Sequence, residues 1–482
     1  MERRQATKSP QEVLVLCREH DVRAVDLRFT DLFGKPHHLT VPVGRLTEAA
    51  FDEGFGFDGS NFQGWQTIDE SDMLLVPLAT SAWIDPFSEI STVVLTCSIL
   101  DPITRQEYAR DPRHIAQRAE NYLTHTGLAD TALIGPEAEF FLFDDVRFDQ
   151  SPQGAFYSID SSEAPWNRGQ PEQRDPRQPN LGHKLRTKAG YLPCPPLDQT
   201  ADVRGDIMQT LIDCGIDVEC HLHEVAAAGQ AEIDVRCDTL LAIADTMMTY
   251  KYIVKNVARR HGKSATFMPK PIFGDSGNGM HVHLSLWKGA EPLFAGTGYA
   301  GLSEMGLHAI GGLLRHAPAL LALTNPTTNS YRRLVPGFEA PINLAYSQRN
   351  RSAACRIPML SPNPKAKRIE FRCPDPSCNP YLAFSAILMA VIDGVQNKIH
   401  PGEPIDKNLY ALNSEASASI PQTPATLEAA LEALTNDCDF LLQGDVFSED
   451  LLRQWIAAKR THEIIPLSQR PHPYEFCMYY DS

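Results

Sequence analysis

The fold is decided by Ile134-Gly135-Pro136-Glu137-Ala138-Glu139-Phe140-Phe141-Leu142-Phe143, an apolar run in which only Glu137 and Glu139 carry charge. Residues two apart on a strand project from the same face, so the two carboxylates lie side by side. Like charges placed this way repel each other and lose hydration on burial unless a cation lies between them. The run therefore predicts a strand with either a cation site or an exposed acidic edge.

Comparable positions on other predicted strands carry more carboxylates and two imidazoles. They are Glu224 and Glu232, the alternating pair His281 and His283, and Glu370. Oxygen ligands dominate this set, which favours Mg²⁺ or Mn²⁺ over zinc or copper. Each motif alone is weak, whereas their repetition on several strands predicts one shared cation site.

Arginines gather between residues 332 and 372, but no P-loop accompanies them. Gly262-Lys263-Ser264 fails as a Walker A motif, because Val257 stands where the first glycine is required. His223-Glu224 fails as a zincin motif, because the second histidine would fall at Ala227. The arginines are Arg332, Arg333, Arg349, Arg351, Arg356, Arg368 and Arg372. Their rigid forks of donors suit phosphate and carboxylate, so the set predicts a wall that holds a polyphosphate; a salt-bridged surface explains any single member equally well.

Composition narrows the class of protein. The 44 basic and 60 acidic residues give a net charge of −16, which argues against nucleic acid or an anionic membrane as the main partner. The eleven cysteines include no Cys-x-x-Cys pair, which is typical of reduced thiols in a cytosolic protein. The polar N-terminus lacks the apolar core of a signal peptide, and no apolar stretch is long enough to span a bilayer. We therefore expect a cytoplasmic protein.

The pattern of predicted elements changes along the chain. Strands prevail before residues 105–112 and a mixture of helices and strands follows, so the sequence predicts two domains, over residues 1–110 and 111–482. Residues 151–200 read as a long functional or oligomer-contact loop. Predicted strands cover residues 24–30, 37–43, 72–77, 92–99, 132–143, 217–223, 229–236, 281–287 and 366–373. Predicted helices cover residues 11–20, 111–126, 200–214, 239–261, 302–323 and 380–398, with an amphipathic helical stretch at 426–459.

Short motifs spread over nearly the whole chain carry a resemblance to a known family. They are Gly56-Phe57-Asp58-Gly59-Ser60, Glu70-Ser71-Asp72-Met73, Gly135-Pro136-Glu137-Ala138-Glu139, His223-Glu224-Val225, Phe267-Met268-Pro269-Lys270-Pro271, Gly279-Met280-His281, Asn325-Pro326-Thr327-Thr328-Asn329-Ser330-Tyr331 and Asn350-Arg351-Ser352. In this order they resemble the glutamine synthetase family, type I. The Lys-Pro and Pro-Thr-Thr-Asn-Ser-Tyr blocks are the most specific of them.

The resemblance implies a fold, an assembly and a reaction. The expected fold is α+β, with a small β-grasp-like N-terminal domain and a larger catalytic domain whose antiparallel sheet is flanked by helices. The expected assembly is a dodecamer of two hexameric rings with active sites between subunits. The expected reaction joins ammonium to the γ-carboxylate of L-glutamate with ATP, through γ-glutamyl phosphate.

The resemblance also implies roles for individual residues. The expected ligands of the first metal are Glu139, Glu224 and Glu232, and those of the second are Glu137, His281 and Glu370. The expected ATP contacts are Glu219, His283, Ser285, Arg351, Arg356 and Arg368. The expected glutamate and ammonium contacts are Tyr191, Ser276, Gly277, Arg333, Glu339 and Arg372. The expected catalytic groups are Arg333, Arg351, the flap carboxylate Glu339 and Asp58, which arrives from the adjacent subunit to bind ammonium and help deprotonate it.

Three positions depart from the family pattern. Asn61 replaces a serine beside the ammonium site, Ser276-Gly277 replaces Asn-Gly at the glutamate amino group, and Leu222 replaces a histidine on the nucleotide strand. In the tail, Met478-Tyr479-Tyr480 resembles an apolar strap that docks into the opposite ring. Tyr410 matches a tyrosine adenylylated by a regulatory adenylyltransferase in some bacterial members, although an unmodified loop tyrosine fits equally well.

Other functions compete with the glutamate–ammonia ligase. A γ-glutamyl ligase for a larger amine, such as a polyamine, would share the scaffold, but the acidic pair Asp58 and Glu339 favours ammonium. A catalytically silent assembly protein would not need the retained ligands. A guanidino kinase shares the combination of metal and arginines, but its characteristic cysteine block is not evident in the sequence.

Overall fold

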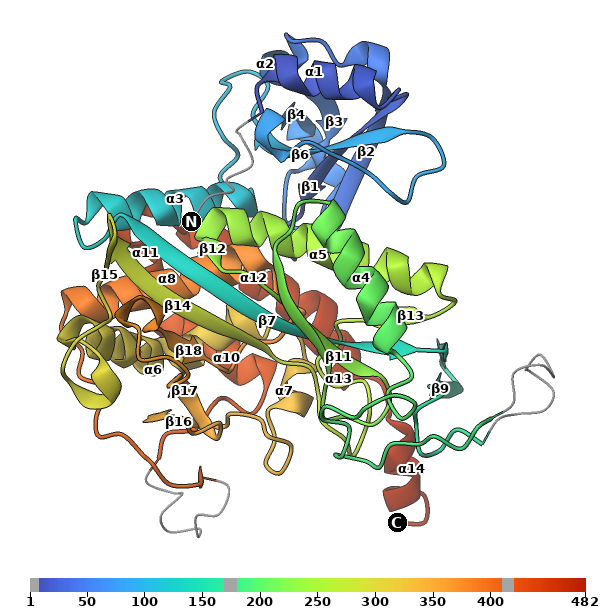
Figure 1. Ribbon diagram of the computed structural model, residues 1–482, viewed down its shortest axis with the longest axis vertical. Helices are drawn as coiled ribbons and strands as arrows, with labels where there is room; N and C mark the ends of the chain where they lie inside the picture. The colour runs from blue at the N-terminus through green and yellow to red at the C-terminus, as the bar shows by residue number, and fades with distance from the viewer. Residues whose placement is uncertain (1–7, 169–179, 410–419) are drawn as a thin grey trace.

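The computed structural model describes residues 8–168, 180–409 and 420–482. Figure 1 shows a small N-terminal part, drawn in blue at the top, above a larger body crossed by two long strands. All strands of the first sheet end by Leu100, and those of the second begin at Thr131. The division at residue 110 stays a prediction, with α3 (Pro112–His125) lying between the two sheets in sequence.

The N-terminal sheet contains six strands in the order β2-β1-β6-β4-β3, with β5 also paired to β6. The strands are β1 (Ala24–Thr30), β2 (Pro36–Pro42), β3 (Phe55–Asp58), β4 (Asp72–Pro77), β5 (Trp83–Ile84) and β6 (Thr92–Leu100). β1 and β6 run parallel and the other pairs run antiparallel. Helices α1 (Pro10–Glu19) and α2 (Ala50–Glu53) accompany this sheet, and α1 begins at a capping box between Ser9 and Glu12.

The larger sheet has ten strands and the order β10-β11-β7-β14-β18-β17-β16 along its main path. These strands are β7 (Thr131–Phe143), β10 (Val218–His223), β11 (Gln230–Val235), β14 (Met280–Lys288), β16 (Asn343–Gln348), β17 (Ala353–Ile357) and β18 (Ile369–Phe371). Short strands β12 (Asp238–Thr239), β13 (Ser264–Thr266) and β15 (Glu291–Pro292) pair at its margins. The pairing is antiparallel except between β16 and β17, which run parallel. Strands far apart in sequence thus become direct neighbours.

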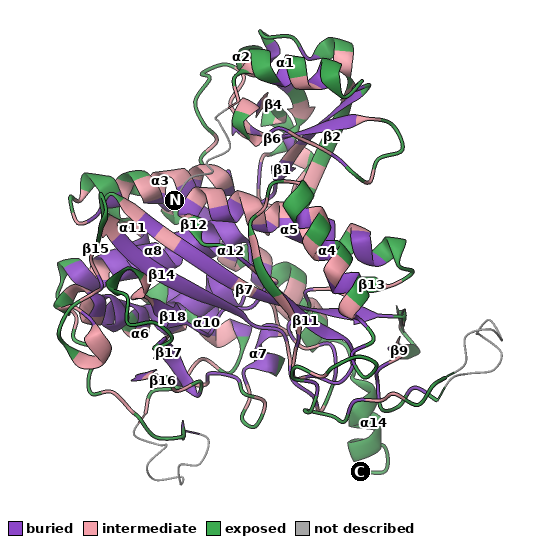
Figure 2. Ribbon diagram, viewed as in Figure 1, coloured by how far each residue is buried: buried purple, intermediate pink, exposed green. Residues whose placement is uncertain are grey.

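Helices accompany the larger sheet, and most of them pack a buried face into its core. They are α3, α4 (Ala201–Asp213), α5 (Leu240–Arg260), α6 (Glu304–Thr324), α7 (Ser330–Arg333), α8 (Pro380–Gln396), α10 (Leu427–Asn436), α11 (Asp439–Leu442), α12 (Glu449–Lys459), α13 (Ile465–Ser468) and α14 (Pro473–Tyr479). α6 and α8 approach closely at Gly312, where an added Cβ would lie 2.1 Å from the carbonyl oxygen of Ala390. Figure 2 shows the buried strands and helices in purple, whereas α14 is exposed.

The structure corrects several predicted elements. The expected loop at 151–200 contains β9 (Gly154–Asp160), which pairs with β8 (Asp145–Ser151). The expected helical stretch at 426–459 is broken between α10, α11 and α12, and Gly444 has a φ of 63° there. The predicted strand at 366–373 shrinks to β18, since a 3₁₀ turn occupies Pro364–Ala366. Within the described residues, no helix is long and apolar enough to cross a membrane.

Candidate active site

Three carboxylates meet on the larger sheet where β7, β10 and β11 run side by side. Glu232 on β11 pairs directly with Glu139 on β7, and Glu224 follows the end of β10. One oxygen from each of Glu139, Glu224 and Glu232 lies within 4.8 Å of the others. Like charges directly opposite each other destabilise a sheet, so this group needs a counter-charge. We refer to Glu139, Glu224 and Glu232 as the first acidic group.

Burial and mutual repulsion shift the first acidic group toward its protonated form. Burial and the charge of Glu224 raise the pKa of Glu139 to about 8. Burial raises the pKa of Glu224 to about 7, and the pKa of Glu232 is raised well above its ordinary value by burial and the neighbouring carboxylates. A divalent cation bound among the three carboxylates would offset this repulsion, because it supplies the positive charge that the first acidic group lacks. The donor set therefore fits a hard metal ion such as Mg²⁺ or Mn²⁺.

Hydrogen bonds hold one member of the first acidic group in place. Oε2 of Glu139 accepts a hydrogen bond from the backbone N–H of Gly279 at 2.8 Å and another from Nε2 of Gln230 at 3.0 Å. The same Nε2 donates to the carbonyl of Gly277 at 3.1 Å and to Oδ1 of Asn278 at 3.2 Å. The glycine-rich segment before β14 is thus tied to the acidic strands, which leaves Glu139 little freedom to turn away.

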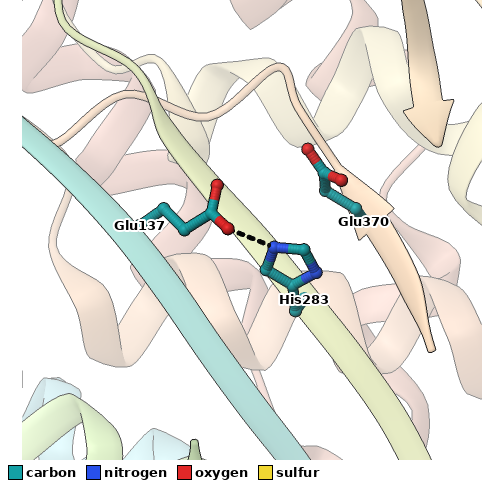
Figure 3. Close-up of side chains that lie close together, drawn as sticks. All are labelled: Glu137, His283 and Glu370. Carbon is teal, nitrogen blue, oxygen red and sulfur yellow. Dashed lines mark hydrogen bonds and ion pairs between the residues drawn. The ribbon is translucent and has the colours of Figure 1, made fainter. Parts of the chain in front are cut away.

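A second group lies on the neighbouring strands β7, β14 and β18 (Figure 3). It consists of Glu137, His283 and Glu370, each with one ligand atom within 4.8 Å of the other two. Nε2 of His283 lies 2.7 Å from Oε1 of Glu137, and Nδ1 of His281 lies 3.3 Å from Oε2 of the same carboxylate. Burial opposes the charge of Glu137, but the two imidazoles outweigh it and lower its pKa. We refer to Glu137, His283 and Glu370 as the second group.

The predicted arginine wall stands beside the second group. Arg356 and Arg372 both donate to the fully buried carboxylate of Glu370, and Nε of Arg368 donates to Nδ1 of His283 at 3.1 Å. Burial alone would raise the pKa of Glu370, but Arg372, His283 and His281 together outweigh it and lower that pKa. Arg333 is buried and donates to the carbonyls of residues 372–374. Three of the predicted arginines, Arg356, Arg368 and Arg372, therefore contact the second group.

Other predicted contacts lie around the first acidic group. The charges of Glu339 and Arg351 act on the carboxylate of Glu224, and the charges of Glu224 and Arg351 act on the phenol of Tyr191. Ser276 is buried and donates its backbone N–H to Asp275, beside Gly277. The structure therefore brings the predicted glutamate-side residues to one end of the sheet.

On the nucleotide side, Ser285 lies on β14 and accepts a hydrogen bond from Nε1 of Trp287 at 3.0 Å. Glu219 is exposed on β10, and its charge reaches Cys237 together with that of Arg368. Of these predicted contacts, Arg368 also bonds to His283 of the second group.

Among the described residues, Asp58 is not brought to this site within the chain. Asp58 lies on β3 of the N-terminal sheet, and its carboxylate accepts hydrogen bonds from Ser60 and Asn61 in its own loop. Tyr410 lies outside the described residues.

Two buried side chains that the sequence reading did not single out also build the site. Gln230 is 1% exposed and bonds to Glu139, and it shares the face of β11 with Glu232. Asp275 is 1% exposed and accepts backbone N–H bonds from Lys188, Ala227 and Ser276. The two-residue spacing of Gln230 and Glu232 could have revealed the first of them. No comparable periodicity marks Asp275, since it stands in a turn.

Comparisons with known proteins agree over the whole chain. Residues 21–102 match the family described as "Glutamine synthetase, beta-Grasp domain", and residues 109–479 match "Glutamine synthetase, catalytic domain". A glutamine synthetase of Frankia alni is 56% identical over 98% of this chain and 99% of its own. One from Mycolicibacterium smegmatis is 52% identical over 99% of this chain and 100% of its own. The solved glutamine synthetase of Plasmodium falciparum superposes with a TM-score of 0.90 at 28% identity, over 98% of this chain and 99% of that one. The predicted α+β fold with a β-grasp N-terminal domain is confirmed.

Proposed function

Because this chain belongs to the glutamine synthetase family, we infer that it uses ATP to join ammonium to the γ-carboxylate of glutamate, giving glutamine, ADP and phosphate. One observation in the structure supports this reaction above all others. The first acidic group and the second group lie on neighbouring strands, and arginines contact the second group. Phosphoryl transfer needs such opposed charge to hold a polyphosphate and to offset the charge of its transition state.

The metal-ligand assignment is a proposal. Glu139, Glu224 and Glu232 would hold one Mg²⁺ or Mn²⁺ ion, and Glu137, His281 and Glu370 would hold a second. The carboxylate oxygens that converge in both groups support it, as does the raised pKa of the first acidic group. When bound, such ions polarise phosphoryl oxygens and offset negative charge. In the same proposal, Glu219, His283, Ser285, Arg351, Arg356 and Arg368 contact ATP.

The reaction needs an activated acyl group, because a free carboxylate is a poor acylating agent. Transfer of the γ-phosphoryl group of ATP to glutamate gives γ-glutamyl phosphate, from which ammonia displaces phosphate. In this proposal Arg333 and Arg372 grip the carboxylates of glutamate, beside Tyr191, Ser276 and Gly277. Arg351, Arg356 and Arg368 neutralise phosphate charge. Arg356 and Arg372 now bond to Glu370, so each must share its fork of donors between Glu370 and a ligand.

Ammonium requires an acidic pocket and a proton acceptor. We propose Asp58 and Glu339 for these roles. Asp58 is exposed, and hydrogen bonds from Ser60 lower its pKa, so it presents a negative charge at the surface of the N-terminal domain. Glu339 lies close enough for its charge to act on Glu224. Since Asp58 bonds only within its own loop among the described contacts, the proposal places it in the site of a neighbouring subunit.

The proposal extends to assembly, regulation and location. A dodecamer of two hexameric rings would bring Asp58 to a neighbouring catalytic domain, and the exposed aromatic residues of α14 are available for contacts between rings. Modification of Tyr410 by an adenylyltransferase and a cytoplasmic location remain predictions from the sequence.

Glutamine formation with ATP, glutamate and ammonium tests the proposal. We expect the wild-type protein to release one phosphate per glutamine, and Asp58→Ala to lose most activity at limiting ammonium. Asp52→Ala, an exposed carboxylate in the same domain, is the control and should behave like the wild type.

Two alternatives have their own readouts. If the wild type releases phosphate with putrescine and not with ammonium, the protein is a ligase for a larger amine. If calorimetric titration detects neither Mn²⁺ nor ATP binding, the protein is a silent assembly protein. The names and high identity of the relatives favour neither alternative.

A further inference from the structure

Phe338 directly precedes Glu339, the expected flap carboxylate, and two lysines contact its ring. Nζ of Lys188 lies 4.1 Å from the centre of the Phe338 ring, and Nζ of Lys270 lies 3.8 Å from it. Lys188 also donates a hydrogen bond to the carbonyl of Gly337 at 2.9 Å. An ammonium group this close to an aromatic face is attracted by the ring, so three contacts fix the position of residues 337–338.

Both lysines are anchored to one buried residue, Lys188 to its carboxylate and Lys270 to its backbone carbonyl. The backbone N–H of Lys188 donates to Oδ1 of Asp275 at 3.0 Å, and Nζ of Lys270 donates to the carbonyl of Asp275. Oδ2 of Asp275 accepts the N–H of Ala227 at 2.9 Å, in the turn that follows Glu224. Because Asp275 is 1% exposed, these bonds are shielded from water. The lysines are therefore connected to the segment that carries the first acidic group.

Glu339 itself has a backbone conformation that must be held by its surroundings. Its φ is 57°, in the left-handed region that residues other than glycine seldom adopt, and Gly337 has a φ of 89°. Such a conformation is strained for a residue with a side chain and persists where neighbouring contacts enforce it. Ala340 is 2% exposed, so the chain is held by burial on one side of Glu339 and by the Phe338 contacts on the other.

We propose that Phe338, gripped by Lys188 and Lys270, is a positioning residue that holds the carboxylate of Glu339 over the first acidic group during catalysis. This inference rests on the proposed function. If the grip is lost, the flap opens more often and water reaches γ-glutamyl phosphate. Water then attacks the acyl carbon, the bond from that carbon to the phosphate oxygen breaks, and glutamate and phosphate leave without glutamine. The specific consequence is phosphate release uncoupled from glutamine formation.

The ratio of phosphate released to glutamine formed tests the inference. We expect Phe338→Leu to raise this ratio at least threefold at limiting ammonium, because leucine keeps apolar volume but lacks a ring. Phe338→Tyr keeps the aromatic ring and therefore its contacts with the two lysines. The ratio should stay within a factor of about 1.5 of the wild-type value. Phe273→Leu is the matched control, since Phe273 is 93% exposed, and it should leave the ratio unchanged.

A second pair of variants keeps the test decisive if Phe338→Leu assembles poorly. Lys188→Met removes an exposed ammonium group but keeps most of the length of the side chain, so it should also raise the ratio of phosphate to glutamine. Lys188→Arg keeps a cation beside the ring, so its ratio should be close to that of the wild type. An unchanged ratio in both Phe338→Leu and Lys188→Met would overturn the inference, as would equal uncoupling by Phe338→Leu and Phe338→Tyr. A wild-type protein that makes no glutamine would instead refute the proposed function, so the two failures are distinct.

Discussion

Nε2 of His283 lies 2.7 Å from Oε1 of Glu137, so this ring joins β14 to the carboxylate on β7. The other ring nitrogen, Nδ1, faces Nε of Arg368 at 3.1 Å. A guanidinium can only donate, so Nδ1 must accept and Nε2 must carry the proton that it donates to Glu137. A metal ion would need a lone pair on Nε2, which this tautomer lacks. Of the two histidines beside Glu137, His281 is therefore the better candidate for a metal ligand.

The two histidines should have separable effects. We expect His281→Ala to weaken activation by Mn²⁺ by more than about tenfold, because it removes the proposed ligand of the second ion. His283→Ala should mainly raise the KM for ATP, since it frees Arg368 and Glu137 from their shared partner. Two titrations separate these effects. Activity is measured at increasing Mn²⁺ with saturating ATP, and at increasing ATP with saturating Mn²⁺. The reverse pattern would make His283 the ligand.

Removal of divalent metal should destabilise the protein through the first acidic group. A ligand present at 100 times its Kd stabilises the folded state by about 2.7 kcal/mol, so Mn²⁺ should raise the melting temperature of metal-free protein. Glu232→Gln removes a ligand and also relieves repulsion, so it should melt higher than metal-free wild type but gain far less from Mn²⁺. Scanning calorimetry with and without Mn²⁺ checks both effects, with Glu304→Gln, an exposed carboxylate at the start of α6, as the control. An equal Mn²⁺ response in Glu232→Gln would contradict the assignment.

The sequence was sufficient to predict the strands that carry the carboxylates. The apolar run in residues 132–143 and the apolar residues around the histidines in 281–287 marked β7 and β14 almost to their ends, since both strands lie in the middle of a sheet with apolar neighbours. Short strands were harder to find. β3, β16 and β17 have four to six residues each and take their structure from pairing with distant segments, which no local pattern encodes.

The charged residues of the site were predictable from the sequence, whereas the hydrogen bonds that join its segments were not. The spacing of Glu137 and Glu139 placed both on one face of a strand, and the structure brings each into a different group. The contacts of Asp275 depend on the meeting of residues 188, 227 and 275–276, which are remote in sequence. Hydrogen bonds of this kind follow from tertiary packing, so a single sequence cannot reveal them.

A buried ion pair behind Glu224 should dominate local stability. Glu163 and His223 are both 0% exposed, with Oε2 and Nε2 3.1 Å apart. Nδ1 of His223 also contacts the carbonyls of Gly190 and Glu224 at 2.7 and 2.8 Å. Removing one partner of a buried pair costs about 3–5 kcal/mol, so Glu163→Ala should lower the urea midpoint strongly, and Glu163→Gln should lower it less because the amide can still accept.

The control for this pair is an ion pair at the surface. Arg236 and Asp217 lie 3.3 Å apart with side chains 60% and 68% exposed, so Asp217→Ala should change stability by less than about 1 kcal/mol. Equal effects of Glu163→Ala and Asp217→Ala would show that the buried pair contributes little.

His316 should make the free energy of unfolding depend on pH. Nδ1 of His316 lies 2.8 Å from Asp437 and Nε2 lies 2.9 Å from Asp393, which joins α6 to α8 and to the end of α10. Burial opposes the charged form, but hydrogen bonds to the two carboxylates outweigh it and raise the pKa of His316. A raised pKa stabilises the fold fully below the unfolded value of about 6.5, and this contribution is lost as pH rises through the folded pKa.

As the pH rises above about 6.5, the melting temperature should therefore fall more steeply in the wild type than in His316→Gln, which cannot charge. The pH-dependent part of the free energy of unfolding should differ between the two proteins by only on the order of 1 kcal/mol, because Asp437 is partly exposed and its attraction for His316 is screened. Parallel curves for the two proteins would mean that His316 does not change its charge in this range.

Mixing two inactive variants should restore activity if Asp58 acts in the site of a neighbouring subunit. Asp58→Ala leaves the acidic groups of its own catalytic domain intact, and Glu232→Gln leaves its own Asp58 intact. When the two are dissociated, mixed in equal amounts and reassembled, a site combines an intact catalytic domain with an intact neighbouring Asp58 in roughly a quarter of cases, by random placement in a closed ring. Glutamine formation should rise to that fraction of the wild-type rate, whereas either variant reassembled alone should stay inactive. A mixture no more active than its parents would place Asp58 and the acidic groups in sites of the same chain, or Asp58 outside the site altogether.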